Sequence, residues 1–353
     1  MEVTNNTAAL VMMSTEMAKT NYSRNDFNET IELVEDILQL NKEFKPIIDY
    51  LLLTILIIIM LAMGCEITWT QLKSHILKPI GIGIGMVSQF FIMPLTAYSL
   101  MRSINVTGLY ATGVLIISCC PGGVLSNVFT YLCDGDLSLS VAMTTFSTLL
   151  AMGMMPLNIW IYGRSFETED LVLPYGNLAL SLIAITTPVG VGMILRWKCP
   201  RIASLVTKFG SYTGILIVIA CIVMEVIVFP NMFTGVPGKL YGVVLSLPML
   251  GVSLGYVLAF CFRQNMPVRK TIAIECGIQN VPTALTIVSL SFKEELQGDI
   301  ILLPWLYGFA MMSGCTVICI AYRIYKRYLA YKSKKEEAFQ LEAQDNLPTQ
   351  NAV

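Results

Sequence analysis

The chain has 353 residues, of which 55% are hydrophobic and only 13% are charged, and its mean hydropathy is +0.67. A soluble domain carries about 25% charged residues, so the composition argues against a soluble enzyme and excludes intrinsic disorder, which requires a low apolar content. The formal net charge of −1 does not supply the basic field that a nucleic-acid-binding protein presents to phosphates. The apolar residues lie in long blocks, which predicts a polytopic membrane protein.

Nine apolar segments of about 20 residues are long enough to cross a bilayer as helices. They cover 46–64, 79–101, 108–132, 138–162, 175–195, 209–230, 240–262, 270–292 and 300–323. The expected fold is therefore an all-α membrane protein with a transmembrane domain over 46–325. An odd number of spans places the two termini on opposite sides of the membrane.

The polar residues 1–45 are expected to form an extracellular tail that can be glycosylated. They contain three N-x-S/T sequons, at Asn5, Asn21 and Asn28, and a fourth sequon at Asn105 lies between the second and third segments. Such sequons are acceptors for N-glycosylation. The tail lacks the basic stretch and short apolar core of a signal peptide.

The distribution of basic residues gives the same orientation. With the N-terminus outside, most Lys and Arg residues fall in the cytoplasmic connections and in the tail 326–353, as the positive-inside rule requires. The exception is the inner connection that contains Asp134 and Asp136, which has no basic residue of its own. The sequence thus predicts a multi-pass protein of the plasma membrane with a cytoplasmic C-terminus.

The third segment is expected to be a broken helix. It contains Pro121, Gly122 and Gly123, followed at once by the polar residues Ser126 and Asn127. Proline removes a backbone donor and glycine weakens a helix, and backbone groups freed within a membrane must find other partners. The pattern predicts an interruption that lines a cavity; a simple kink or a close helix contact is the alternative.

The eighth segment carries an ionisable residue in the same kind of setting. Glu275, Gly277, Gln279, Asn280 and Pro282 lie within about two helical turns of an apolar run. An ionisable group at the bilayer centre costs about 2.5–3.5 kcal/mol on insertion scales. We therefore expect Glu275 to bind a cation or a proton, the alternative being a carboxylate that is hydrogen-bonded for packing alone.

The two interrupted segments are five positions apart in chain order and so run in opposite directions across the membrane. This is the arrangement of an inverted-topology repeat, in which broken helices form ion and substrate sites near the midplane. One carboxylate among neutral oxygens suits Na⁺, a hard cation. The groups expected to supply these oxygens are the side chains of Ser126, Asn127, Thr144, Glu275 and Gln279 and the carbonyls near Cys276 and Ile278.

Histidine and cysteine usage argues against other chemistries. The single histidine, His75, lies in a connection, so no span offers a histidine for a proton relay or a His-based triad. The ten cysteines lie mostly inside apolar segments without zinc-site spacing, and we expect them to be small buried residues. An intramembrane hydrolase is therefore disfavoured, and the chain is not expected to be an enzyme.

Several motifs together resemble the sodium/bile acid cotransporter family, over residues 46 to about 325. The matching stretches are Cys120 to Phe129, Asp134 to Ser140, Met143 to Thr145, Gly153 to Leu157, Gln89 with Phe90, Ile92 to Tyr98, and the Glu275-x-Gly277-x-Gln279-Asn280 pattern. The resemblance implies a core domain (about 79–162 and 240–323) with two crossing broken helices. A panel domain (about 46–64 and 175–230) would lie against it.

The resemblance also implies a set of site residues. One sodium site would be formed by Ser126, Asn127, Ser140, Thr144 and Glu275. A second would be formed by Gln89, Glu275, Gln279 and the carbonyls of Cys276 and Ile278, with Asn280 next to the substrate. Members of the family usually couple two sodium ions to the uptake of an amphipathic organic anion such as a bile salt or a steroid sulfate. No organic cofactor is implied, and the oligomeric state is left open.

The sequence departs from the bile-salt carriers beside the crossing. Cys276 stands where those carriers typically have threonine, and Pro282 stands where they typically have glutamine. The resemblance therefore leaves open which organic anion is the substrate. The leading interpretation is a sodium-coupled symporter, and the alternative is a membrane receptor or sensor with the same fold.

Overall fold

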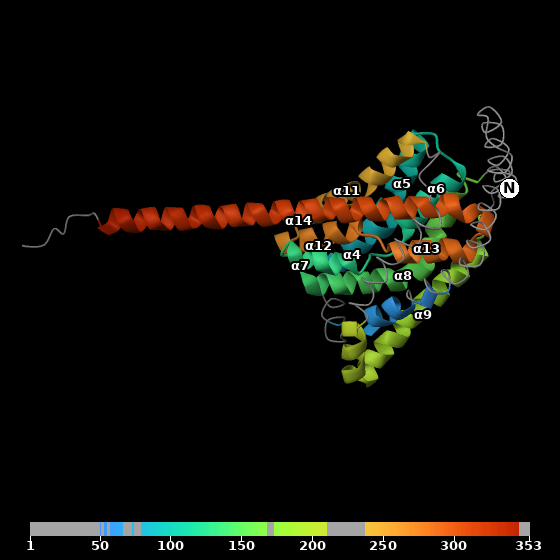
Figure 1. Cartoon of the computed structure of the whole chain (residues 1–353), viewed down its shortest axis with the longest axis horizontal. Helices are drawn as coiled ribbons and strands as arrows, with labels where there is room; N and C mark the ends of the chain where they lie inside the picture. The colour runs from blue at the N-terminus through green and yellow to red at the C-terminus, as the bar shows by residue number, and fades with distance from the viewer. Residues whose placement is uncertain are drawn as a thin grey trace, which may run out of the picture.

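The computed structural model describes residues 50, 53–54, 57–65, 73, 79–167, 173–209 and 237–345, and all its regular elements there are helical (Figure 1). In chain order they are α4 (Ile80–Val87), η1 (Ser88–Ile92), α5 (Met93–Ser103), α6 (Gly108–Cys119), α7 (Leu125–Leu132), α8 (Leu137–Gly163), α9 (Tyr175–Lys198), α11 (Gly238–Cys261), α12 (Met266–Gly277), α13 (Val281–Ser291) and α14 (Glu294–Asp345). The expectation of an all-helical membrane protein is thereby confirmed at this level.

Five helices in the described part of the chain are long and apolar enough to cross a membrane. They are Ile80–Ser103, Leu137–Gly163, Tyr175–Lys198, Gly238–Cys261 and Leu296–Glu336. Each overlaps one of the predicted segments, and Leu296–Glu336 extends past the predicted end at 323. The segment 46–64 is described as helix mainly over 57–65, and 210–230 lies outside the described residues, so the count of nine spans stays a prediction.

The third and eighth predicted segments are each two short helices joined by a non-helical stretch, as the sequence predicted. The first break separates α6 from α7 and the second separates α12 from α13. Cys120 is extended, with ψ of 156°, because the proline that follows it disfavours the helical conformation. In the second break, Asn280 caps α13 by accepting a hydrogen bond from the Thr283 N–H at 3.1 Å.

The segment at 79–101 contains a feature that the sequence did not predict. Ser88–Ile92 forms a π-helix, η1, between α4 and α5. A π-helical turn hydrogen-bonds from residue i to i+5 and shifts the neighbouring side chains around the helix axis. Its position matters because Gln89 lies within it.

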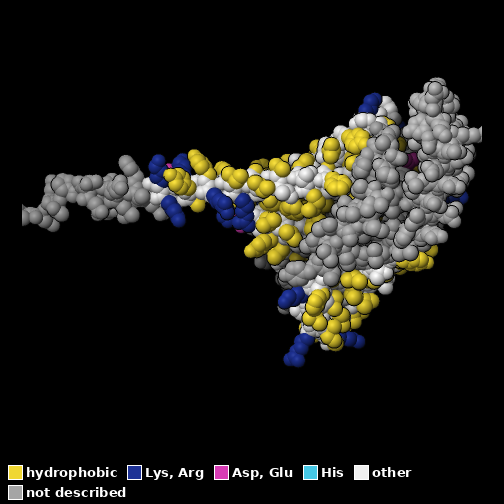
Figure 2. All heavy atoms as spheres, in the orientation of Figure 1, with side chains coloured by type: hydrophobic (Ala, Val, Ile, Leu, Met, Phe, Trp, Pro, Cys, Tyr) yellow, Lys and Arg dark blue, Asp and Glu magenta, His cyan; other side chains and the backbone are white. Residues whose placement is uncertain are grey.

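The helices form a bundle along which α14 runs as the longest element (Figure 1). α14 packs against α6, α11 and α13, while α7 packs against α12 and α8 packs against α9. The predicted span ended at residue 323, but the helix continues to Asp345 and its last part projects beyond the bundle. Figure 2 shows hydrophobic side chains spread over the flank of the bundle, and Lys and Arg side chains gathered where α14 leaves it.

Candidate functional site

The two broken helices meet backbone to backbone at their breaks. The Gly123 N–H donates to the Ile278 carbonyl at 2.9 Å, and the Asn280 N–H donates to the Pro121 carbonyl at 3.0 Å. Gly122 and Gln279 thus form an isolated antiparallel bridge. The breaks satisfy one another's polar groups, which is the requirement for irregular backbone inside a membrane.

The crossing requires glycine at positions 122 and 123, because there is no space for a Cβ atom there. A Cβ atom on Gly122 would collide with Oε1 of Glu275, and one on Gly123 would lie 2.8 Å from the Gln279 carbonyl oxygen. The Pro-Gly-Gly sequence therefore does two things: the proline ends α6, and the glycines allow a carboxylate and a second backbone to approach.

Glu275 is buried at the crossing, with only 1% of its surface exposed. Its carboxylate accepts hydrogen bonds from Ser140 Oγ at 3.1 Å and from Thr144 Oγ1 at 2.5 Å. Ser126 Oγ lies 3.5 Å from Thr144 Oγ1. Asn127, the next residue in α7, carries a buried Oδ1 that has no hydrogen-bond partner among the described residues. The structure thus places one acidic side chain among neutral oxygens.

The charge of Glu275 has no protein counterion in the described part of the chain, since no Lys or Arg forms an ion pair with it there. A buried carboxylate without a counterion is costly. The described part of the chain also contains no cluster of three or more His, Cys, Asp or Glu side chains that would suit a transition metal. The chemistry of these ligands fits a monovalent hard cation better than zinc or iron.

A second group of oxygens surrounds Gln89 of the π-helix. Gln89 Nε2 donates to Gln279 Oε1 at 2.5 Å and to the Cys120 carbonyl at 2.7 Å. Gln279 Nε2 donates to the Cys276 carbonyl at 3.2 Å. Gln89 Oε1 is buried and has no partner within the residues described. Of the groups expected at a second sodium site, the side chains of Gln89 and Gln279 and the Cys276 carbonyl are therefore joined by hydrogen bonds. The Ile278 carbonyl accepts instead from the Gly123 N–H, and the Glu275 carboxylate accepts from Ser140 and Thr144.

Asn280 lies at the crossing but its Oδ1 is engaged as the cap of α13, so its amide nitrogen is the group left to donate to a ligand. Asn105 is exposed in the connection after α5 and has a positive φ of 55°. The other sequons, Asn5, Asn21 and Asn28, lie outside the described residues.

Three buried polar side chains that the sequence analysis did not single out bond to the backbone of the breaks and of η1. Ser147 Oγ accepts from the Gly122 N–H at 3.1 Å. Asn158 Nδ2 donates to the Phe90 carbonyl of η1 at 2.9 Å. Tyr307, which is fully buried, donates its hydroxyl to the Gly277 carbonyl at 2.8 Å. Polar residues inside apolar segments were the available signal, but a sequence does not show which backbone group each one reaches.

In the part of the chain that the structure describes, all regular elements are helices, five are of membrane length, and two interrupted helices cross. These features are those of a multi-pass membrane protein. A profile of the sodium bile acid symporter family matches residues 53–233. The chain is 34% identical to the human sodium-dependent organic anion transporter, an alignment covering 80% of this chain and 74% of the relative. It is 38% identical to the ileal sodium/bile acid cotransporter of Oryctolagus cuniculus, covering 79% of this chain and 83% of the relative.

A third relative, the hepatic sodium/bile acid cotransporter of Rattus norvegicus, is 33% identical, with 85% of this chain and 83% of the relative covered. The family profile and the three relatives agree. The chain therefore belongs to the sodium bile acid symporter family, which is a family of transporters and not of enzymes.

Proposed function

We propose that this protein is a sodium-coupled symporter that imports an amphipathic organic anion of the bile salt or steroid sulfate class. The observation that carries the proposal is Glu275, a buried carboxylate that accepts hydrogen bonds from the hydroxyls of Ser140 and Thr144 at the crossing of two broken helices. The names of the relatives, which specify sodium dependence and bile acids or organic anions, support it.

Two sodium ions are proposed to bind at the crossing. The first takes oxygens from Ser126, Asn127, Ser140, Thr144 and Glu275. The unpartnered Oδ1 of Asn127 supports this assignment, because a hard cation supplies the partner that the buried oxygen lacks.

The second ion is proposed to share Glu275 and to use Gln89, Gln279 and the carbonyls of Cys276 and Ile278. The unpartnered Oε1 of Gln89 is the matching observation for this site. Binding requires the hydrogen bond between the two glutamine side chains to rearrange, since that bond now occupies Gln279 Oε1.

The ends of the four half-helices give the crossing regions of partial negative charge and regions of partial positive charge. α6 and α12 end there with their carbonyls, which favour cations, and α7 and α13 begin there with their N–H groups, which favour anions. We place the anionic group of the substrate near the start of α13, next to Asn280. Pro282 in the first turn of α13 removes one N–H donor from that end, a difference expected to change the choice of anion.

Alternating access is proposed to couple the two solutes. Sodium enters from outside, neutralises Glu275 and orders the crossing, which completes the anion site; the loaded core (79–162 and 240–323) then moves against the panel (46–64 and 175–230). The membrane potential supplies about 2.3 kcal/mol per charge per 100 mV. This mechanism assumes the plasma membrane, an extracellular tail 1–45 and a cytoplasmic tail 326–353.

Uptake of radiolabelled taurocholate and estrone sulfate by transfected cells, with sodium or choline outside, tests the proposal. We expect at least one anion to accumulate in sodium and not in choline. Uptake that is independent of sodium would contradict the coupling. Saturable binding without uptake of any anion in a broad panel would support a receptor instead.

The variant Glu275→Gln is expected to abolish sodium-driven uptake while the protein still reaches the cell surface. The amide keeps the shape of the carboxylate but removes the charge that attracts both ions. Asn127→Ala should also abolish sodium-driven uptake, because it removes an oxygen from the first proposed sodium site. Thr186→Val is the matched control, because the buried Thr186 hydroxyl bonds only to its own helix at Leu182. Normal uptake by Glu275→Gln would show that the site assignment is wrong.

A further inference from the structure

Two cysteine thiols face each other where the broken helix α6–α7 meets α14. Cys133 caps the C-terminal end of α7, and Cys319 lies on α14, 186 positions further along the chain. Their Sγ atoms are 2.8 Å apart, and both residues are buried, at 4% and 6% exposure. Among the nine described cysteines, all of which are free thiols, this is the one pair with a sulfur–sulfur contact.

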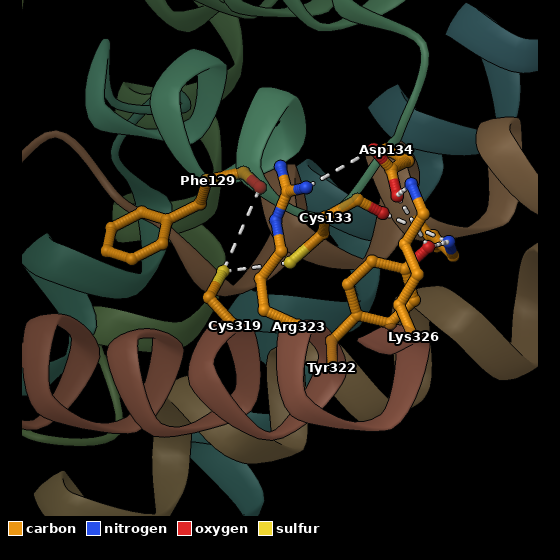
Figure 3. Close-up of polar contacts among 8 residues, drawn as sticks. Phe129, Cys133, Asp134, Cys319, Tyr322, Arg323 and Lys326 are labelled. Carbon is orange, nitrogen blue, oxygen red and sulfur yellow. Dashed lines mark hydrogen bonds and ion pairs between the residues drawn. The ribbon is translucent and has the colours of Figure 1, made fainter. Parts of the chain in front are cut away.

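The backbone around the pair is held from several directions (Figure 3). Lys270 Nζ, from α12, donates to the Cys133 carbonyl at 3.0 Å and to Tyr322 Oη at 2.8 Å. Tyr322 in turn donates to Asp134 Oδ2 at 2.8 Å. The chain at Cys133 and Asp134 is therefore tied to Tyr322, three positions after Cys319 on α14, which holds the two cysteines on facing elements.

The distance between the two sulfur atoms is close to that of a disulfide bond. A disulfide needs sulfurs about 2.05 Å apart on side chains that point toward each other. Closing the remaining gap requires the two sulfurs to approach by less than about 1 Å. A pair held so closely has a high effective concentration, so reaction within the pair outcompetes reaction with outside thiols.

We propose that Cys133 and Cys319 form a reversible redox modification site that joins α7 to α14 by a disulfide, with hydrogen peroxide as the oxidant. One thiol attacks a peroxide oxygen, the O–O bond breaks, and a sulfenic acid and one water are formed. The second thiol then attacks the sulfenic sulfur and a second water leaves. The two sulfurs together lose two electrons, and the peroxide gains them.

The pair Cys133 and Cys319 lies at the end of α7 away from the crossing. Its oxidation does not depend on sodium coupling. α7 carries Ser126 and Asn127 in its first turn and Cys133 at its other end. The disulfide would therefore fasten the far end of a half-helix that contributes oxygens to the crossing. A dithiol rather than a permanent disulfide is expected in a reducing compartment.

The test uses the full-length protein in lipid nanodiscs, treated with hydrogen peroxide, quenched with catalase and alkylated with N-ethylmaleimide in denaturant. Digestion without reductant and mass spectrometry are expected to show a peptide pair linked through Cys133 and Cys319, with two fewer alkylated thiols. Dithiothreitol should restore both thiols. The exposed Cys199 and Cys261 report the oxidant dose.

Cys315→Ser is the matched control, because Cys315 is buried one turn before Cys319 on the same helix; the linked peptides should persist in this variant. They should disappear in Cys133→Ser, in which Cys319 is expected to stop at the sulfenic acid. If both cysteines of the wild-type protein stay alkylated at a dose that oxidises Cys199 and Cys261, the proposal is overturned. Sulfenic acid or mixed disulfides alone would overturn it equally.

Discussion

At the crossing, a glycine lies directly against a carboxylate. A methyl group on Gly122 would occupy the space of Glu275 Oε1, and both are buried, so neither can move away without cost. Overpacking of this kind typically costs about 1–3 kcal/mol, and about 1.4 kcal/mol changes a binding constant tenfold. We predict that Gly122→Ala raises the sodium concentration for half-maximal uptake about tenfold or more.

The control for Gly122→Ala is Gly153→Ala in α8, where a Cβ atom would meet no other atom within 4 Å. That substitution adds the same methyl group to a helix and is expected to leave the sodium dependence unchanged. Surface expression should be measured for both variants. If Gly122→Ala keeps the wild-type sodium curve, the carboxylate is less tightly confined than the structure indicates.

At the scale of single elements, the π-helix η1 receives a hydrogen bond from a side chain of another helix. Asn158 of α8 is buried and donates to the Phe90 carbonyl inside η1. Removing a hydrogen-bond partner from a buried group costs about 1–3 kcal/mol. We predict that Asn158→Ala shifts Gln89, which lies next to Phe90, and weakens the apparent sodium affinity roughly tenfold. Sodium titration of uptake measures this.

Thr145→Val on the same helix is the matched control, since the Thr145 hydroxyl bonds only to Val141 within α8. The substitution keeps the side-chain shape and is expected to leave sodium affinity unchanged. Equal effects of the two variants would mean that Asn158 supports the fold of α8 and not the position of η1.

Some of these elements could be predicted from the sequence and others could not. The two breaks were predictable because Pro121 and the glycines act through their own backbone, and Glu275 stood out because a charge in an apolar run is costly. The π-helix was not predictable, because Ser88–Ile92 contains neither proline nor glycine, and Asn158, which bonds to the Phe90 carbonyl, is 68 positions away. The extension of α14 to Asp345 was missed because hydropathy marks only the part of a helix that faces lipid.

Across the whole molecule, the site depends on contacts between distant parts of the chain. Gln89, Cys120 and Gln279 are joined by hydrogen bonds that span up to 190 positions. The sequence indicated Gln279 by its place in an apolar segment and Gln89 only through the family resemblance, and it did not indicate the Cys120 carbonyl. It did not predict their pairing, and the hydrogen bonds of Ser147 and Tyr307 to the breaks were not expected.

The connection at Asp134, which has no basic residue of its own, receives positive charge from the other end of the chain. Asp134 Oδ2 lies 2.6 Å from Lys326 Nζ, and Arg323 lies 3.9 Å from Oδ1 (Figure 3). The connection lies outside the spanning segments, and the hydrogen bond from Lys326, followed by that from Tyr322, lowers the pKa of Asp134 below its ordinary value. The carboxylate thus links the α7–α8 connection to α14.

We predict that Asp134→Asn lowers the thermal stability of the purified protein only slightly. The Asp134 side chain is 38% exposed, and solvent-screened pairs contribute about 0.2–1 kcal/mol. Because its pKa is lowered in the folded state, this contribution is fully present above the ordinary Asp pKa of about 3.9 and is lost as the pH falls through the lowered value. The difference in Tm between wild type and variant should therefore be constant from about pH 5 to 8 and shrink only in stronger acid.

The matched control is Glu336→Gln, which breaks the exposed i,i+4 pair with Lys332, 3.9 Å apart on the projecting part of α14. That pair lies within one helix, so its loss should leave Tm unchanged. A drop in Tm for Asp134→Asn that Glu336→Gln does not share would show that the ion pair holds two parts of the bundle together. Equal melting curves for the wild type and both variants would mean that burial alone fixes α14 against α7.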